Sequence, residues 1–156
     1  MRRVPNKMAD ARRPRILIVD DDVQLLDALQ RMLRPRFEVT VATDSKEALR
    51  VVVAEEPFAV VIADLRMPGM DGVSLLFCIR QAAPDTVSVL LTGHADLEAA
   101  TAAVNHGDAF RLLTKPCNPA VLFRALEASV ERHRLITAGR MHLESTSNCP
   151  LGGPKP

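Results

Sequence analysis

The sequence ILIVDDD, residues 16–22, runs four apolar residues directly into three aspartates. An apolar run without polar alternation is typical of a parallel strand whose two faces are both covered. The aspartates would then follow the carboxyl end of that strand, where the loops of an open α/β sheet carry ligand-binding groups. This stretch predicts a buried strand with an acidic site at its end.

Three other apolar runs end in the same way. Asp64 ends the run that begins at residue 59, Thr92 follows residues 89–91, and Lys115 follows residues 112–114. If these runs are parallel strands, their carboxyl ends meet at one edge of one sheet. We therefore expect two kinds of charge and one hydroxyl to converge there.

Five apolar segments alternate with segments of helical periodicity. We expect strands at 15–19, 37–42, 58–63, 86–91 and 110–114, and helices at 23–33, from Asp44 to before Pro57, at 73–82, at 96–106 and from Asn118 onward. Gly107 is placed to close the fourth helix in the left-handed conformation. Right-handed crossovers through these helices predict a three-layer, doubly wound α/β fold with a five-stranded parallel sheet.

Composition narrows the functional classes. A chain of 156 residues with 47% hydrophobic content can bury one substantial core, and its formal charge of +1 gives no field that would attract nucleic acid or an anionic membrane. No apolar stretch approaches the roughly 20 residues that cross a bilayer. Three widely spaced cysteines argue against a disulfide framework and a zinc site, so a cytoplasmic location fits best.

The domain organisation follows from the same reading. We expect a disordered basic leader at 1–13, one folded domain at 14–134, and a helical extension with a disordered tail at 135–156. Leu135, Ile136 and Leu143 continue the helical pattern, while Gly139 interrupts it. A signalling helix, a coiled-coil seam and a fraying exposed extension all remain open.

The acidic residues suggest a metal site. Asp20, Asp21 and Asp64 would supply the hard oxygen ligands that Mg2+ prefers. The alternative is that Asp22 only caps the helix that follows and its neighbours are solvated. Asp64 favours the metal, because clustered like charges are costly unless a cation or a shared proton compensates.

The same residues also suit phosphoryl chemistry. A carboxylate such as Asp64 can attack phosphorus and hold the group as an acyl phosphate. Lys115 would offer a second cation for the transferring group, and the Thr92 hydroxyl could hydrogen bond to a phosphoryl oxygen. Taken alone, Thr92 would read as an ordinary β-branched strand residue.

Four segments together resemble the receiver domain of bacterial two-component response regulators. They are ILIVDDD at 16–22, VVIADLRMPGMDG at 60–72, VLLTGHAD at 89–96 and LLTKPC at 112–117, and the resemblance covers residues 14–134. It implies a flavodoxin-like sheet with strand order 2-1-3-4-5. It also implies that Asp64 accepts a phosphoryl group from a histidine kinase or phosphotransfer protein.

The resemblance carries over to individual positions of the site. It implies that Mg2+ is bound by Asp21, Asp64 and the backbone carbonyl of Arg66, with Asp20 acting through water. It further makes Thr92 the switch hydroxyl and Lys115 the phosphate partner, followed by a cis bond to Pro116.

Two features concern the response and its duration. The family usually has an aromatic residue three positions before the lysine, where this chain has Leu112. We expect a differently built coupling to the surface of segments 96–106, 110–114 and the helix from Asn118, which an output domain or a second copy would engage. Arg66 and His94, two residues after Asp64 and Thr92, are candidates for tuning the phosphoryl lifetime.

Two other classes of protein share some of these residues. A haloacid-dehalogenase-like phosphatase would need Thr or Val where the chain has Gln24, and room for a cap. A pseudo-receiver would bind partners without phosphorylation, yet all four kinds of site residue are present. We therefore expect a signalling domain with at most self-phosphorylation and self-dephosphorylation, either stand-alone or the front of a longer regulator resembling those with HD-type phosphodiesterase domains.

Overall fold

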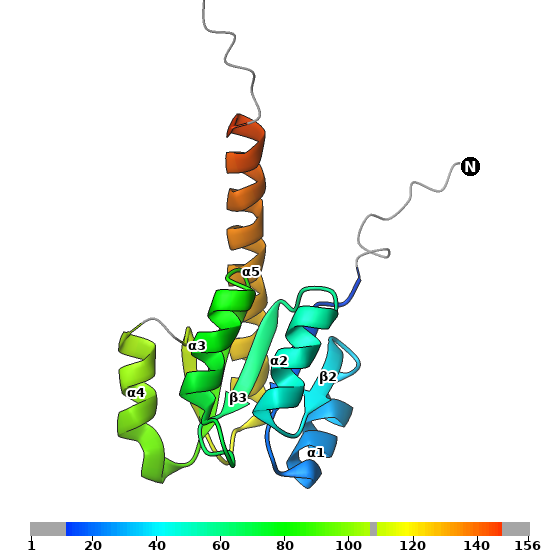
Figure 1. Cartoon of the computed structure of the whole chain (residues 1–156). Coiled ribbons are helices and arrows are strands. Elements are labelled where there is room, and N and C mark those ends of the chain that lie inside the picture. The colour runs from blue at the N-terminus through cyan, green and yellow to red at the C-terminus, as the bar shows by residue number, and fades with distance from the viewer. Residues whose placement is uncertain (1–11, 107–108, 148–156) are drawn as a thin grey trace, which may run out of the picture.

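A computed structural model describes residues 12–106 and 109–147. In these residues five strands alternate with five α-helices (Figure 1). The strands are β1 (Arg15–Val19), β2 (Glu38–Ala42), β3 (Val60–Asp64), β4 (Val87–Thr92) and β5 (Arg111–Thr114). The helices are α1 (Val23–Leu33), α2 (Ser45–Ala54), α3 (Gly72–Ala82), α4 (Leu97–Asn105) and α5 (Pro119–Ser147), with a 3-10 turn η1 (His94–Asp96) before α4. Every predicted element is present.

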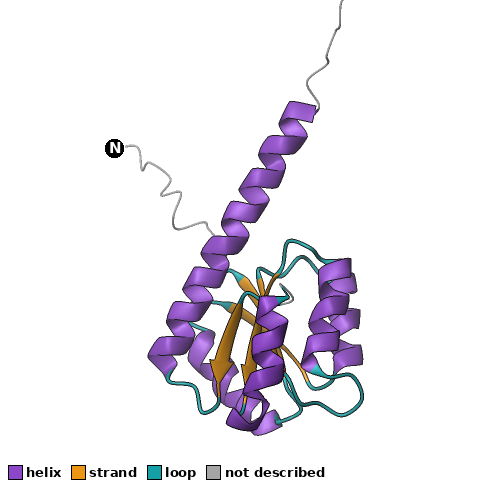
Figure 2. Ribbon diagram, turned by 90° about the vertical axis from the view of Figure 1, so that its left-hand side faces the viewer, coloured by secondary structure: helices purple, strands orange, loops and turns teal. Residues whose placement is uncertain are grey.

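The sheet is parallel throughout, with strand order β2-β1-β3-β4-β5. Helices α2, α3 and α4 pack on one face, and α1 and α5 pack on the other (Figure 2). The prediction of a three-layer, doubly wound fold with order 2-1-3-4-5 is confirmed.

The apolar runs are explained by burial on both faces of the sheet. Leu17 and Val19 of β1 belong to the core under α2, α3 and α4, whereas Ile16 and Ile18 belong to the core under α1 and α5. All four side chains are buried. Each such side chain contributes about 1.5–3 kcal/mol by leaving water. The central strands therefore need no polar face, and their first polar residues fall at the strand ends.

Local hydrogen bonds fix where the helices begin. Asp22 Oδ1 accepts from Leu25 N at 3.1 Å, Asp44 Oδ1 accepts from Glu47 N at 2.8 Å, and Asn118 Oδ1 accepts from Ala120 N at 2.8 Å. Asp22 is therefore the cap of α1, as one of the two predictions for this residue stated, although its neighbour Asp20 is buried and not solvated. Gly107, predicted to close α4, lies outside the described residues.

Helix α5 continues well past the sheet (Figure 1). It is 29 residues long and includes Leu135, Ile136 and Leu143. Arg140 Nη2 pairs with Asp85 Oδ1 at 3.0 Å, which ties this extension to the turn between α3 and β4. Residues 1–11 and 148–156 lie outside the described residues, and with them most of the predicted leader and tail. No helix of the described part is long and apolar enough to span a membrane.

Gly72 provides a test of how α3 meets β3. Its N–H donates to Leu65 O at 2.9 Å, and a Cβ added at Gly72 would lie 2.2 Å from Asp64 O. Gly72→Ala must therefore push α3 off the strand end, and we expect a loss of about 1–3 kcal/mol in chemical denaturation. Gly139→Ala is the matched control, because nothing lies within 4 Å of a Cβ there. The control should stabilise by about 0.5–1 kcal/mol; equal effects at both sites would contradict this packing.

Candidate functional site

The strand register brings the four polar signals to one edge. Val19 pairs with Ala63, so the residues that follow, Asp20 and Asp64, come side by side. Asp64 pairs with Leu91, one residue before Thr92, and Thr92 pairs with Thr114, one residue before Lys115. The structure therefore confirms that Asp20, Asp64, Thr92 and Lys115 converge at the carboxyl edge of the sheet.

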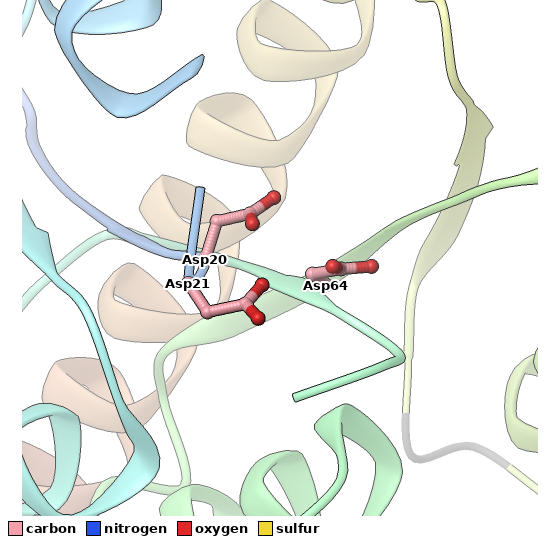
Figure 3. A group of neighbouring side chains, drawn as sticks. All are labelled: Asp20, Asp21 and Asp64. Atoms are coloured by element: carbon pink, nitrogen blue, oxygen red, sulfur yellow. The ribbon is translucent and has the colours of Figure 1, made fainter. Parts of the chain in front are cut away.

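Three carboxylates form a compact cluster at this edge. Asp20 and Asp21 follow β1, Asp64 ends β3, and their side chains point the same way in Figure 3. One oxygen from each lies within 4.8 Å of the others, a grouping that could hold a metal ion. Asp20 and Asp64 are buried and Asp21 is exposed. Hard carboxylate oxygens, one of them open to solvent, fit a small divalent cation that keeps part of its water shell.

Lys115 enters the cluster from the end of β5. Its Nζ lies 2.7 Å from Asp20 Oδ2 and 3.2 Å from Asp64 Oδ2. Its backbone N–H donates to Thr92 O at 2.7 Å, and the bond to Pro116 is cis, as predicted. One ammonium group is thus shared between two buried carboxylates.

The pKa values of Asp64 and Lys115 are both raised, for different reasons. Burial raises the pKa of Asp64, and repulsion from Asp20 raises it further, more than attraction to Lys115 lowers it. Burial alone would lower the pKa of Lys115, but its hydrogen bond and charge interaction with Asp20, followed by those with Asp64, raise it overall. Because Lys115 lies nearer to Asp20, Asp64 is left as the less compensated carboxylate.

The Thr92 hydroxyl has no partner among the described residues. Its side chain is fully buried, and Oγ1 makes no hydrogen bond within the described part of the chain. A buried hydroxyl without a partner costs about 1–3 kcal/mol. Thr92 follows Leu91, the register partner of Asp64, so its position is at the same carboxyl edge as the acidic cluster.

The loop after Asp64 is joined to the start of α4. Arg66 Nη2 lies 2.7 Å from Asp96 Oδ1, while its backbone N–H faces Asp64 Oδ1 at 3.4 Å. A pocket of about 530 Å³ lies here, lined by Asp21, Leu65, Arg66, Met67, Pro68, Asp71, Asp96 and Ala99. The sequence predicts Asp96 only as the start of a helix. The one hint of this ion pair in the sequence is that Asp96 and Arg66 carry opposite charges.

Two other predicted positions lie at the rim. His94 begins η1, and its side chain is not among those described. Leu112 is half-buried and packs against the core under α2, α3 and α4. Phe110 lies beside the guanidinium groups of Arg111 and Arg132, with centroid distances of 5.2 and 5.3 Å.

The sequence is similar to a family of known proteins. Residues 16–127 match the family model "Response regulator receiver domain". This chain belongs to that family. The receiver is 33% identical over 87% of its length to the hydrogenase transcriptional regulatory protein HoxA of Cupriavidus necator, covering 28% of that protein.

Solved structures agree with this assignment. The receiver matches a structure described as adenylate cyclase from Rhodopirellula baltica with TM-score 0.83 and 40% identity, over 86% of this chain and 98% of that one. It matches the signal receiver domain of an HD domain-containing protein from Pseudomonas fluorescens Pf-5 with TM-score 0.73 and 37% identity, over 80% and 91%. The predicted family and its signalling role are confirmed, and nothing favours the phosphatase or pseudo-receiver alternatives. The receiver spans roughly a quarter to a third of the curated relatives it matches.

Because the pKa of Asp64 is raised, removing its charge should increase the folding stability by an amount that depends on pH. A carboxylate whose pKa is higher when folded costs stability above that pKa, and the cost vanishes below the ordinary value of 3.8. Asp64→Asn should therefore stabilise the metal-free protein at neutral pH, seen as a rise in Tm. The gain should shrink as pH falls toward 3.8. Asp27→Asn, the same substitution at an exposed position of α1, is the matched control and should give a smaller gain at neutral pH. A neutral-pH loss in the Asp64 variant would contradict this assignment.

Proposed function

We propose that Asp64 is the phosphoacceptor of this receiver and that its phosphorylation switches the conformation of the domain. One observation carries the proposal: Asp64, a buried carboxylate whose pKa is raised, has Oδ2 3.2 Å from Lys115 Nζ, at the sheet edge where the buried Thr92 hydroxyl has no partner among the described residues. In the unmodified protein, both its burial and its neighbour Asp20 disfavour the negative charge of Asp64. A nearby cation or a bond from Asp64 to phosphorus would therefore relieve an unfavourable negative charge on this carboxylate.

The transfer step balances simply. An Asp64 carboxylate oxygen forms a bond to the phosphorus of a phosphohistidine on the kinase or phosphotransfer protein. The phosphorus–nitrogen bond breaks, and the imidazole nitrogen keeps the electron pair. Lys115 Nζ, now 3.2 Å from Asp64 Oδ2, would donate to a phosphoryl oxygen and offset the added charge.

The acidic cluster supports Mg2+ as the cofactor of this step. Asp21, Asp64 and the Arg66 backbone carbonyl would hold the ion, with Asp20 acting through water. When bound, the ion supplies positive charge to the phosphoryl oxygens. Three carboxylates within 4.8 Å and one shared lysine leave net negative charge at the site, which is the reason that such an ion fits.

Thr92 and Leu112 would carry the response. The Thr92 hydroxyl gains its missing hydrogen bond from a phosphoryl oxygen, and β4 would shift toward the phosphorylated Asp64. Leu112 packs against the buried cluster that includes α4 residues Ala100 and Ala103, so it would respond to a movement of that helix in place of the usual aromatic rotamer change. The surface of α4, β5 and α5 is then the one that an output domain or a second copy would engage.

The remaining assignments belong to the same proposal. The domain acts in the cytoplasm, receives its phosphoryl group from a histidine kinase or phosphotransfer protein, and has at most self-phosphorylation and self-dephosphorylation activity. Arg66 and His94 would tune how long the phosphoryl group survives. The output partner stays general, because the matched relatives range from transcriptional regulators to an HD domain-containing protein.

Intact mass after incubation with acetyl phosphate and MgCl2 tests the phosphoacceptor. The wild type should gain one phosphoryl group, because acetate leaves as Asp64 attacks phosphorus. Asp64→Asn should gain none, while Asp27→Asn, an exposed change of equal charge on α1, should gain one. Sustained acetyl phosphate hydrolysis through an Asp20-linked intermediate would indicate a phosphatase instead. An unchanged wild-type mass would indicate a pseudo-receiver.

Thermal unfolding of Thr92→Val tests the switch hydroxyl. Removing a buried hydroxyl that has no partner should stabilise the unphosphorylated protein by about 1 kcal/mol. Phosphoryl uptake should persist, but the rise in Tm that accompanies phosphorylation should be smaller than in the wild type. Thr92→Ser keeps the hydroxyl and should retain that rise. Destabilisation of the unphosphorylated Val variant beyond that of Ser would show that the hydroxyl already has a partner.

A further inference from the structure

The ion pair between Arg66 and Asp96 lies beside the acidic cluster. Arg66 Nε donates a hydrogen bond to Asp96 Oδ1 at 2.8 Å, and Arg66 Nη2 lies 2.7 Å from the same oxygen in an ion pair. The Arg66 side chain is 74% exposed and that of Asp96 is 15% exposed. Both residues line the same pocket as Asp21. The pair therefore connects the loop after Asp64 with the first turn of α4.

Asp96 also occupies a helix start, but it does not act as a cap. Asp22, Asp44 and Asp71 precede α1, α2 and α3, and each accepts a hydrogen bond from a backbone N–H of its helix. Asp96 precedes α4 and accepts none. A capping carboxylate ordinarily stabilises a helix by about 1 kcal/mol. In this structure the Asp96 carboxylate is bound by Arg66 instead.

Phosphorylation would change which group holds Arg66. A phosphoryl group on Asp64, two residues before Arg66, adds negative charge and oxygen acceptors that suit a planar guanidinium. The existing pair is weak competition, because Arg66 is largely exposed and solvent screens its charge. The charge of Asp64 already acts on the Arg66 guanidinium alongside that of Asp96, so an exchange of acceptors would require a movement of the Arg66 side chain.

We propose that Asp96 is a positioning residue for this chemistry. It directs the Arg66 guanidinium toward α4 while Asp64 is unmodified, and it releases Arg66 when Asp64 is phosphorylated. The released carboxylate then caps α4. This inference rests on the proposed phosphorylation of Asp64, and it gives that event a route to α4 that needs no aromatic residue at position 112.

The exchange also sets the phosphoryl lifetime. In hydrolysis a water oxygen attacks phosphorus, the bond to the Asp64 oxygen breaks with its electron pair returning to the carboxylate, and inorganic phosphate leaves. Arg66 on the phosphoryl oxygens covers the side from which water approaches. Asp96 competes for that guanidinium and so shortens the lifetime.

The test compares Asp96→Asn, Arg66→Gln, the double variant and Glu98→Gln after loading with acetyl phosphate and MgCl2. Asn still caps helices but does not hold Arg66 by charge, so Asp96→Asn should lengthen the acyl phosphate half-life about threefold or more. Arg66→Gln should shorten the half-life, and the double variant should match it. Glu98→Gln removes an equal charge from the first turn of α4 and should match the wild type.

Amide hydrogen exchange of the first turn of α4 gives a second readout, independent of lifetime. Arg66→Gln releases Asp96, so it should protect these amides in the unphosphorylated protein even though it shortens the half-life. In the wild type the same protection should appear only on phosphorylation. A purely structural role for Asp96 would instead make Arg66→Gln loosen α4.

Three outcomes would overturn the inference. A lengthened half-life that persists in the double variant would show that Asp96 does not act through Arg66. An unprotected α4 in both Arg66→Gln and the phosphorylated wild type would remove the capping step. No gain in wild-type mass would reject the proposed function and this inference together, whereas a normal gain with either of the other results rejects the inference alone.

Discussion

The crowding of three carboxylates at the carboxyl edge is the constraint on which the rest of the structure depends. Asp20 and Asp64 are buried side by side because Val19 of β1 pairs with Ala63 of β3, and each aspartate is the next residue of its chain segment. Lys115 lies against both, yet one cation cannot balance three carboxylates that approach within 4.8 Å. The edge therefore keeps an excess of negative charge, which favours a bound cation and keeps Asp64 easy to neutralise.

Much of this could be predicted from sequence because a doubly wound sheet has little freedom. Uniformly apolar strands must be covered on both faces, parallel strands must end at one edge, and polar residues at those ends must therefore meet. Asp20, Asp64, Thr92 and Lys115 followed from that reasoning. Asp22 followed from capping alone, since a carboxylate that accepts from Leu25 N serves the helix.

The Arg66–Asp96 pair could not be predicted in the same way. The two residues come from separate loops, and a loop side chain has no register to fix its direction. Asp96 also has the sequence appearance of an ordinary helix cap, as Asp44 does, and only the structure shows that its carboxylate is bound elsewhere. The helical extension was equally undetermined, because Gly139 weakens a helix without ending it.

Helix α5 relates the two ends of the molecule. It begins at Pro119, close in sequence to Lys115, and Leu122 and Leu126 fix its first turns in the core under α1. Its later turns leave the sheet, where the ion pair of Arg140 with Asp85 holds them to the turn before β4. The same helix thus follows directly from the charged edge and is fastened at the opposite end of β4, the strand that carries Thr92. In the proposed switch, a shift of β4 toward its carboxyl edge would act on both attachments of α5, and the extension would then respond to the phosphorylation of Asp64.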